Sequence, residues 1–101
     1  MEYSFGNKHL EELYTAGKSK KYRFVDPAAA NKFVEAVAVI KSAEIVQDFW
    51  QLRSLNFESL GGNNYSMRLS KKARLILEIQ WENEEKQKGA VTIVDVTKHY
   101  E

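Results

Sequence analysis

The sequence predicts an α+β domain of two layers, with two N-terminal helices packed on one face of a twisted antiparallel sheet of three to five strands. The first observation is the alternation of apolar and polar residues in the second half of the chain, above all from 63 to 81. The second is the helical spacing of apolar residues between 10 and 40. A chain of 101 residues provides one hydrophobic core, so we expect a single domain over 1–101.

The chain is expected to begin with a short strand and a capped helix. Residues 2–5 alternate, with both aromatic side chains on one side. Asn7 suits the N-cap of a helix, and Gly17 suits its end. The apolar stripe of this helix is Leu10, Leu13 and Tyr14.

A second helix has the clearest start signal in the chain. Asp26 is suited to the N-cap, and Pro27 to the first helical position. Its apolar stripe is Ala29, Phe33, Val37 and Ile40. We expect this helix to pack on the sheet with the first helix beside it. Residues 42–51 suit a short helical turn that covers an edge of the core.

A β-hairpin is predicted over 63–81, with Lys71 and Lys72 at its turn. Its apolar side consists of Tyr65, Met67 and Leu69 in one arm and of Leu75, Leu77, Ile79 and Trp81 in the other. Residues 52–60 are interpreted as an extended segment that leads into the sheet, and the glycine-rich stretch 61–64 as a turn.

The C-terminal part is predicted to contain one more strand. The charged stretch 82–89 is too polar to pack and is expected to form a loop. Residues 90–97 are rich in β-branched side chains and are predicted to be the last strand. We expect this strand to pair with the second arm of the hairpin.

Composition excludes several kinds of site. The chain has no cysteine, which excludes disulfides, thiolate zinc sites and thiol nucleophiles. With two histidines and no paired acidic ligand spacing, we expect no metal and no cofactor. No apolar run approaches the roughly 20 residues that span a bilayer, and the N-terminus does not resemble a signal peptide. We therefore expect a cytoplasmic protein.

The polar side of the predicted hairpin carries the candidate functional residues. Arg68 and Arg74 are expected to lie close together on it. The neighbouring segments add Arg53, Lys71, Lys72, Lys98, His99 and Tyr100. One interpretation is a solvated sheet face with a frayed tail. The other is a surface for RNA, because arginine forks bind phosphate and aromatic rings stack on unpaired bases.

An RNA-cleaving reaction would fit these residue types without a metal. The 2′-hydroxyl of RNA is the nucleophile, and the enzyme supplies a base, an acid and cations for the phosphorane. His99 titrates near neutrality and suits the acid or the base. Arg74 and Arg68 suit charge stabilisation, and Lys98 would add positive charge or lower the pKa of a neighbour.

A second basic segment lies between the two predicted helices, in the sequence KSKKYRF that begins at Lys18. It is interpreted either as a solvated connection or as a strip that contacts nucleic acid or a partner protein.

Several segments resemble the RelE/ParE superfamily of bacterial toxins, most closely its HigB-like, RelE-type branch. They are the opening at 5–14, the segment LRSL at 52–55, NNYSMRL at 63–69, ARLILEI at 73–79 and the terminal KHYE at 98–101. The resemblance spans nearly the whole chain. It implies a RelE-like fold and a toxin of a type II toxin–antitoxin system, a metal-independent, ribosome-dependent mRNA endonuclease that inhibits translation. The implied partners are the ribosome, mRNA and a cognate antitoxin, HigA-like with a helix-turn-helix, in a hetero-oligomer.

The resemblance also implies roles for individual residues. Arg74 matches the arginine that stabilises the scissile phosphate, and His99 and Tyr100 match a C-terminal His/Tyr pair, with either as the acid. Arg53 falls where relatives place a basic residue or a histidine. Arg68 and Lys71 are looser matches and are expected to contact RNA or the ribosome. Lys72, at the hairpin turn, is expected to bind RNA as well.

Two features depart from the family pattern. The net charge is only +1, whereas the family is often strongly basic, and Glu58 stands where some relatives have a lysine. Two other functions therefore stay open: a non-catalytic, ParE-like inhibitor of DNA gyrase, and a non-enzymatic module that binds RNA or protein. The terminal His-Tyr sequence argues against the first, and the low net charge favours the second.

Overall fold

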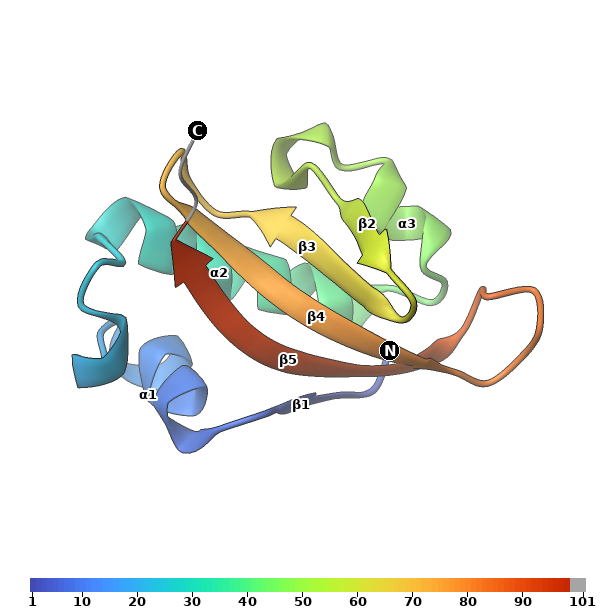
Figure 1. Ribbon diagram of the computed structural model, residues 1–101, viewed down its shortest axis with the longest axis horizontal. Helices are drawn as coiled ribbons and strands as arrows, with labels where there is room; N and C mark the ends of the chain where they lie inside the picture. Colours follow the sequence, from blue (N-terminus) through green and yellow to red (C-terminus); the bar gives the residue numbers. More distant parts are fainter. Residues whose placement is uncertain (99–101) are drawn as a thin grey trace.

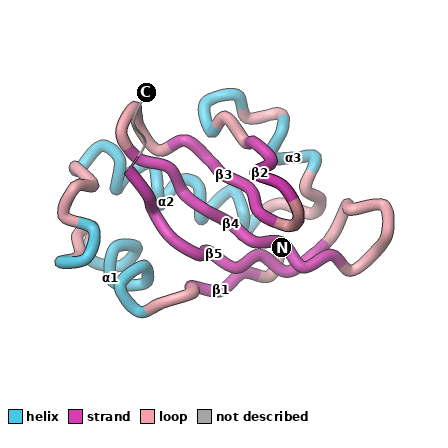
Figure 2. The backbone as a smooth tube through the Cα atoms, in the orientation of Figure 1, coloured by secondary structure: helices cyan, strands magenta, loops and turns pink. Residues whose placement is uncertain are grey.

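The computed structural model describes residues 1–98, which form a five-stranded sheet with its helices on one face (Figure 1). The elements in chain order are β1 (Tyr3–Phe5), α1 (Lys8–Ala16), the 3₁₀ turn η1 (Lys20–Tyr22), α2 (Pro27–Ser42), α3 (Gln47–Trp50), the 3₁₀ turn η2 (Arg53–Leu55), β2 (Glu58–Gly61), β3 (Asn64–Arg68), β4 (Ala73–Trp81) and β5 (Gly89–Lys98). The strand order is β1-β5-β4-β3-β2. In Figure 2, α2 lies behind the strands of the sheet and α1 lies at the lower left beside the end of β5, and the other side of the strands faces the viewer.

The predicted helix boundaries are confirmed by their capping bonds. The side chain of Asn7 accepts a hydrogen bond from the backbone N–H of Leu10 at 3.0 Å, and that of Asp26 accepts one from Ala29 at 2.8 Å. Each bond satisfies a backbone donor that has no partner within the helix. Gly17 adopts φ +77°, the left-handed conformation that glycine permits at a helix end.

The sheet is mixed, which differs from the all-antiparallel sheet that the sequence predicts. β2, β3, β4 and β5 pair antiparallel, but β1 pairs with β5 in parallel, with Tyr3 opposite Val91 and Phe5 opposite Ile93. A parallel pair requires a long crossover connection, and the whole chain between Phe5 and β5 supplies it. The strand itself was predicted from alternation, but alternation does not specify a partner strand.

The core lies between the sheet and the helices. The α2 stripe predicted from the sequence is buried throughout, and Phe33 at its centre contacts the rings of Phe5 and Tyr14. From the sheet, β4 contributes alternate residues, with Leu75, Leu77 and Ile79 fully buried. The apolar side of the hairpin is therefore the side that faces the helices.

The segment 52–60 is only partly extended. η2 interrupts it, and the strand begins at Glu58, because Asn56 adopts a left-handed φ of 45° that ends the 3₁₀ turn. Phe57 is nevertheless buried, and its ring stacks on that of Tyr65 with 5.0 Å between centroids. The following turn is confirmed: Gly61 pairs with Asn64.

A β-bulge changes the facing of β5 near its end. Leu77 pairs with Ile93, but Ile76 pairs with Asp95, so β5 has one more residue than β4 between these pairs. Without the bulge, alternation from Ile93 would turn the Asp95 carboxylate into the core. With it, Val96 is buried instead. The bulge thus sets which side of the sheet each of the last residues of β5 occupies.

Candidate nucleic-acid interface

Three residues form a row across the polar side of the sheet. Arg68 of β3 is directly opposite Arg74 of β4, and Arg74 is directly opposite Thr97 of β5. Directly opposed residues point to the same face and lie about 5 Å apart at their Cβ atoms. The predicted convergence of the two arginines is therefore confirmed.

Two like charges directly opposite each other destabilise a strand pair. An anion between or above the two guanidinium groups reduces that repulsion and accepts hydrogen bonds from both. Arginine is suited to this because its planar fork donates two parallel hydrogen bonds to one phosphate. The opposition of Arg68 and Arg74 in the strand register therefore suits this part of the sheet to binding a phosphate group.

The β3–β4 turn adds two lysines beside this pair. Lys71 and Lys72 are exposed, and the backbone N–H of Lys72 donates to Ser70 Oγ at 3.2 Å. Arg53 is exposed at the start of η2. Arg53 is not in a strand, so the pairing of β3 with β4 that brings Arg68 and Arg74 together does not place Arg53 beside them.

Lys98 lies on the other side of the sheet from the arginine row. It is opposite Ala73, whose side chain is buried among the core residues. Its Nζ atom is 5.5 Å from the ring centroid of Phe24, a cation–π contact with the segment that leads into α2. The structure thus separates Lys98 from Arg74 by the thickness of the sheet. His99 and Tyr100 lie outside the described residues.

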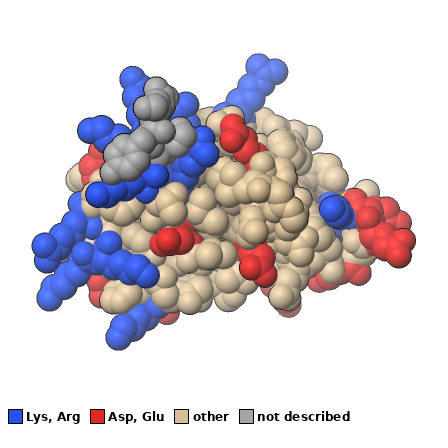
Figure 3. All heavy atoms as spheres, viewed as in Figure 1, with Lys and Arg blue, Asp and Glu red and all other residues tan. Residues whose placement is uncertain are grey.

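The charge of the protein is segregated although its sum is small. In Figure 3, lysine and arginine gather at one end of the molecule, over the α1–α2 connection and the β3–β4 turn. Acidic residues gather at the opposite end, over the β4–β5 loop, which contains Glu82, Glu84 and Glu85. Local clustering of this kind attracts polyanions irrespective of the net charge. The net charge of +1 is therefore compatible with a basic binding surface.

A partly buried hydrogen-bond network ties the basic α1–α2 connection to the bulge of β5. The Tyr22 hydroxyl donates to Asp95 Oδ1 at 2.7 Å and accepts from Asn7 Nδ2 at 3.2 Å. Burial is the largest cause that raises the pKa of Tyr22 to about 12; the hydrogen bond from Asn7 lowers this pKa, and the hydrogen bond and charge of Asp95 raise it. Sequence reasoning missed this network. The available signal was Asp95 at a position where uninterrupted alternation would bury it.

We expect the stability that Tyr22 provides to be lost at high pH. Below pH 10 the phenol is protonated in both states. Between pH 10, its ordinary pKa, and about 12, the unfolded chain releases the proton while the folded protein retains it, so the free energy of unfolding falls. Urea unfolding at pH 9 and pH 11 should show this fall, and the Tyr22→Phe variant should show less of it. At pH 7 we expect Tyr22→Phe to cost about 1.5–3 kcal/mol, because the Asp95 carboxylate loses a donor.

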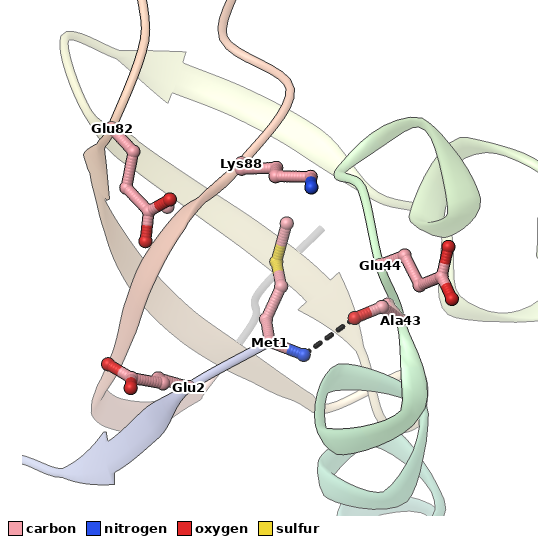
Figure 4. Close-up of a pocket in the computed structure, with 7 residues that line it drawn as sticks. Met1, Glu2, Ala43, Glu44, Glu82 and Lys88 are labelled. Atoms are coloured by element: carbon pink, nitrogen blue, oxygen red, sulfur yellow. Dashed lines mark hydrogen bonds between the residues drawn. The ribbon is translucent and has the colours of Figure 1, made fainter.

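Among the described residues, two hollows outside the arginine row are of a size to hold a ligand. The first, of about 470 Å³, lies between the N-terminal strand, the end of α2 and the β4–β5 loop. Its lining includes Glu2, Glu44 and Glu82, and the α-amino group of Met1 donates to the Ala43 carbonyl at 2.6 Å (Figure 4). These acidic side chains do not favour an anion. The second hollow, of about 650 Å³, lies beside η1, with Lys18, Lys20 and Arg23 in its lining.

The features of a metal site and of a membrane span are both absent from residues 1–98. No group of three or more His, Cys, Asp or Glu side chains there is placed to hold a metal ion. No helix in the same range combines the length and apolar character needed to cross a bilayer.

Comparison with known proteins shows the fold. No protein-family model matches the chain, and no curated protein matches its sequence. Among solved structures, a YoeB/ParE toxin from Agrobacterium tumefaciens is similar, with a TM-score of 0.55 over 99% of this chain and 100% of that one. The chain has the fold of that toxin. The RelE-like α+β fold expected from the sequence is confirmed, and because sequence identity is only 11%, the likeness concerns the fold alone.

Proposed function

We propose that this protein is the toxin of a type II toxin–antitoxin system, a metal-independent endoribonuclease that cleaves mRNA on the ribosome and so inhibits translation. The observation that supports this proposal most is the direct opposition of Arg68 and Arg74 on the side of the sheet away from the helices. The fold shared with a YoeB/ParE toxin and the resemblance of its sequence segments to RelE-type toxins point to the same class.

The proposed reaction uses the nucleophile that RNA itself supplies. The 2′-hydroxyl attacks the adjacent phosphorus, a P–O bond forms, and the bond to the 5′-oxygen breaks, which leaves a 2′,3′-cyclic phosphate. Arg74 and Arg68 stabilise the charge that develops on the phosphoryl oxygens. His99 and Tyr100, which follow β5 in the sequence, are proposed to accept the 2′ proton and to donate one to the leaving oxygen.

The other cations are proposed to bind rather than to react. Lys71 and Lys72, beside the arginine row, would contact neighbouring phosphates, and Arg53 would contact RNA from η2. Lys98 points to the helix side of the sheet, so we assign it a role in binding or in positioning the tail instead of contact with the reacting phosphate.

The proposed partner is an antitoxin, HigA-like with a helix-turn-helix, that binds the toxin in a hetero-oligomer and prevents cleavage. Cytoplasmic location follows from this proposal, because the substrate is mRNA on the ribosome.

Cleavage by the purified protein in a reconstituted translation system tests the proposal. Wild-type protein from EDTA-treated, metal-free stocks should cut ribosome-bound mRNA and should leave free mRNA largely intact. Intact mRNA combined with inhibited supercoiling by DNA gyrase would instead identify the ParE-like alternative. Intact mRNA, active gyrase and normal growth after induction without an antitoxin would identify a non-enzymatic binding module.

A further inference from the structure

The hollow beside η1 has the features of an anion site. Its lining includes the cations Lys18, Lys20 and Arg23 and a single acidic residue, Glu12. Ser19 also lines it, and this side chain is 93% buried, from a relative exposure of 7%. The Ser19 Oγ atom has no hydrogen-bond partner among residues 1–98. A buried hydroxyl without a partner is costly, so it calls for a ligand or another explanation.

A phosphate group would satisfy this arrangement. It carries the negative charge that the three cations favour. Rotation about the Cα–Cβ bond of Ser19 would bring its Oγ, which is closed to solvent, into the hollow, where it would donate a hydrogen bond to the phosphate. A carboxylate has the same sign, but it carries less charge and fewer oxygens. The apolar remainder of the lining, Ala16, Tyr22 and Val25, lowers the local dielectric and strengthens such interactions.

The hollow is connected to the arginine row by a band of cations and aromatic rings. Lys21 Nζ lies 5.6 Å from the ring centroid of Tyr22, the rings of Tyr22 and Phe24 are 6.3 Å apart, and Lys98 Nζ lies over Phe24. Lys98 is in turn opposite Ala73, the first residue after the Lys71–Lys72 turn. Figure 3 shows lysine and arginine side chains gathered at the end of the molecule where the α1–α2 connection and the β3–β4 turn lie.

The position of the hollow relative to the sheet is fixed by hydrogen bonds. Tyr22 closes η1 and donates to Asp95 in β5, while Asn7 joins the same hydroxyl from the start of α1. Asp95 is an acidic residue beside the band, and this bond occupies one of its oxygens. The two ends of the band are therefore held at a fixed separation, as simultaneous contact with the cleaved mRNA and with ribosomal RNA requires.

We propose that the hollow lined by Ser19, Lys20 and Arg23 binds a backbone phosphate of ribosomal RNA, distinct from the phosphate that is cleaved. This inference rests on the proposed function and names a second contact through which the toxin would be oriented on the ribosome. An acidic protein segment is the competing occupant, and measurements of ribosome and antitoxin binding separate the two.

The first test uses purified ribosomes programmed with mRNA as the binding probe, over a series of KCl concentrations. Lys20→Gln/Arg23→Gln should bind roughly 5- to 30-fold more weakly than wild type at low salt. Its plot of log affinity against log salt should be shallower by about 0.7–0.9 for each phosphate that the variant no longer binds. The matched control Lys41→Gln/Lys86→Gln, two exposed lysines outside the band, should bind like wild type.

The second test is Ser19→Ala, which separates binding from folding. Removal of an unpaired buried hydroxyl should leave the urea midpoint unchanged or raise it. Ribosome affinity should nevertheless fall, by roughly 10-fold, because the phosphate loses a charge-assisted hydrogen bond. Wild-type affinity in Ser19→Ala would overturn the phosphate site.

The outcomes also separate this inference from the proposed function. If wild-type protein neither binds ribosomes nor cuts mRNA, the proposed function fails, and the inference with it. If wild type binds and cuts while Lys20→Gln/Arg23→Gln binds ribosomes equally well, the inference alone is overturned. Loss of antitoxin binding in that variant, with ribosome binding intact, would overturn it in favour of an acidic protein segment.

Discussion

The Arg74→Gln variant is expected to cut ribosome-bound mRNA about 10²–10³-fold more slowly than wild type. Arg74 occupies the centre of the row that Arg68 and Thr97 complete, so its guanidinium would lie nearest a phosphoryl group held across the strands. Loss of one group that stabilises transition-state charge has an effect of this size in other enzymes. The measurement is the single-turnover cleavage rate with ribosomes in excess.

Three controls make this result interpretable. Arg74→Lys keeps the charge but loses the planar fork, so its rate should lie between those of wild type and Arg74→Gln. Lys41→Gln removes an exposed charge at the end of α2, away from the row, and should cleave normally. Circular dichroism of Arg74→Gln should match wild type, because the residue lies on the polar side of the sheet. Equal cleavage by Arg74→Gln and wild type would refute the nuclease assignment.

Sequence alone predicted those parts of the fold that short-range chemistry specifies. The Asn7 and Asp26 caps, the Gly17 helix end and the facing of the Arg68–Arg74 pair all depend on residues close together in the chain. A cap needs one side-chain acceptor three residues before its donor, and a hairpin register needs only its turn and its alternation. These features therefore followed from the residues directly.

The features that sequence did not predict depend on long-range partners. The parallel pairing of β1 with β5 joins residues about ninety positions apart. Nothing in the sequence of either strand identifies the other as its partner. The bulge in β5 moves Asp95 toward Tyr22 and places Lys98 on the helix side. One extra residue in a strand moves every later side chain of that strand to the opposite face of the sheet. A predicted site at the end of a strand therefore depends on whether the strand contains a bulge.

The bulge also bears on how the candidate site should be divided. Arg68 and Arg74 face one side of the sheet, whereas Lys98 contacts Phe24 on the other. Arg74 and Lys98 are thus close in the strand register but lie on opposite faces of the sheet, and these two faces meet at the end of the sheet. In the function proposed above, the arginine row binds the reacting phosphate, and the hollow on the η1 side binds a second anion. The low net charge is no obstacle, because most of the acidic residues that offset these cations lie elsewhere.

Phe33→Ala is expected to lower the free energy of unfolding by about 3–5 kcal/mol, the largest stability effect among single substitutions considered for this protein. Phe33 is fully buried, and its ring packs 6.4 Å from Phe5 and 6.5 Å from Tyr14 between centroids. Its removal leaves a cavity where β1, α1 and α2 meet. A loss of that size is a large part of the roughly 5–15 kcal/mol typical of small domains. Urea unfolding followed by tryptophan fluorescence measures it.

The adjacent residue supplies a matched control for this substitution. Val34 is on the same helix but is 38% exposed, so Val34→Ala should change the free energy of unfolding by no more than about 0.5 kcal/mol. The contrast depends on the α2 stripe facing the sheet, because a helix rotated by one residue would exchange the two side chains. Similar losses in both variants would show that α2 does not present Phe33 to the core. The helices would then not cover the apolar face of the sheet as described. The reason for treating the opposite face, which carries the arginines, as the one available to RNA would be lost.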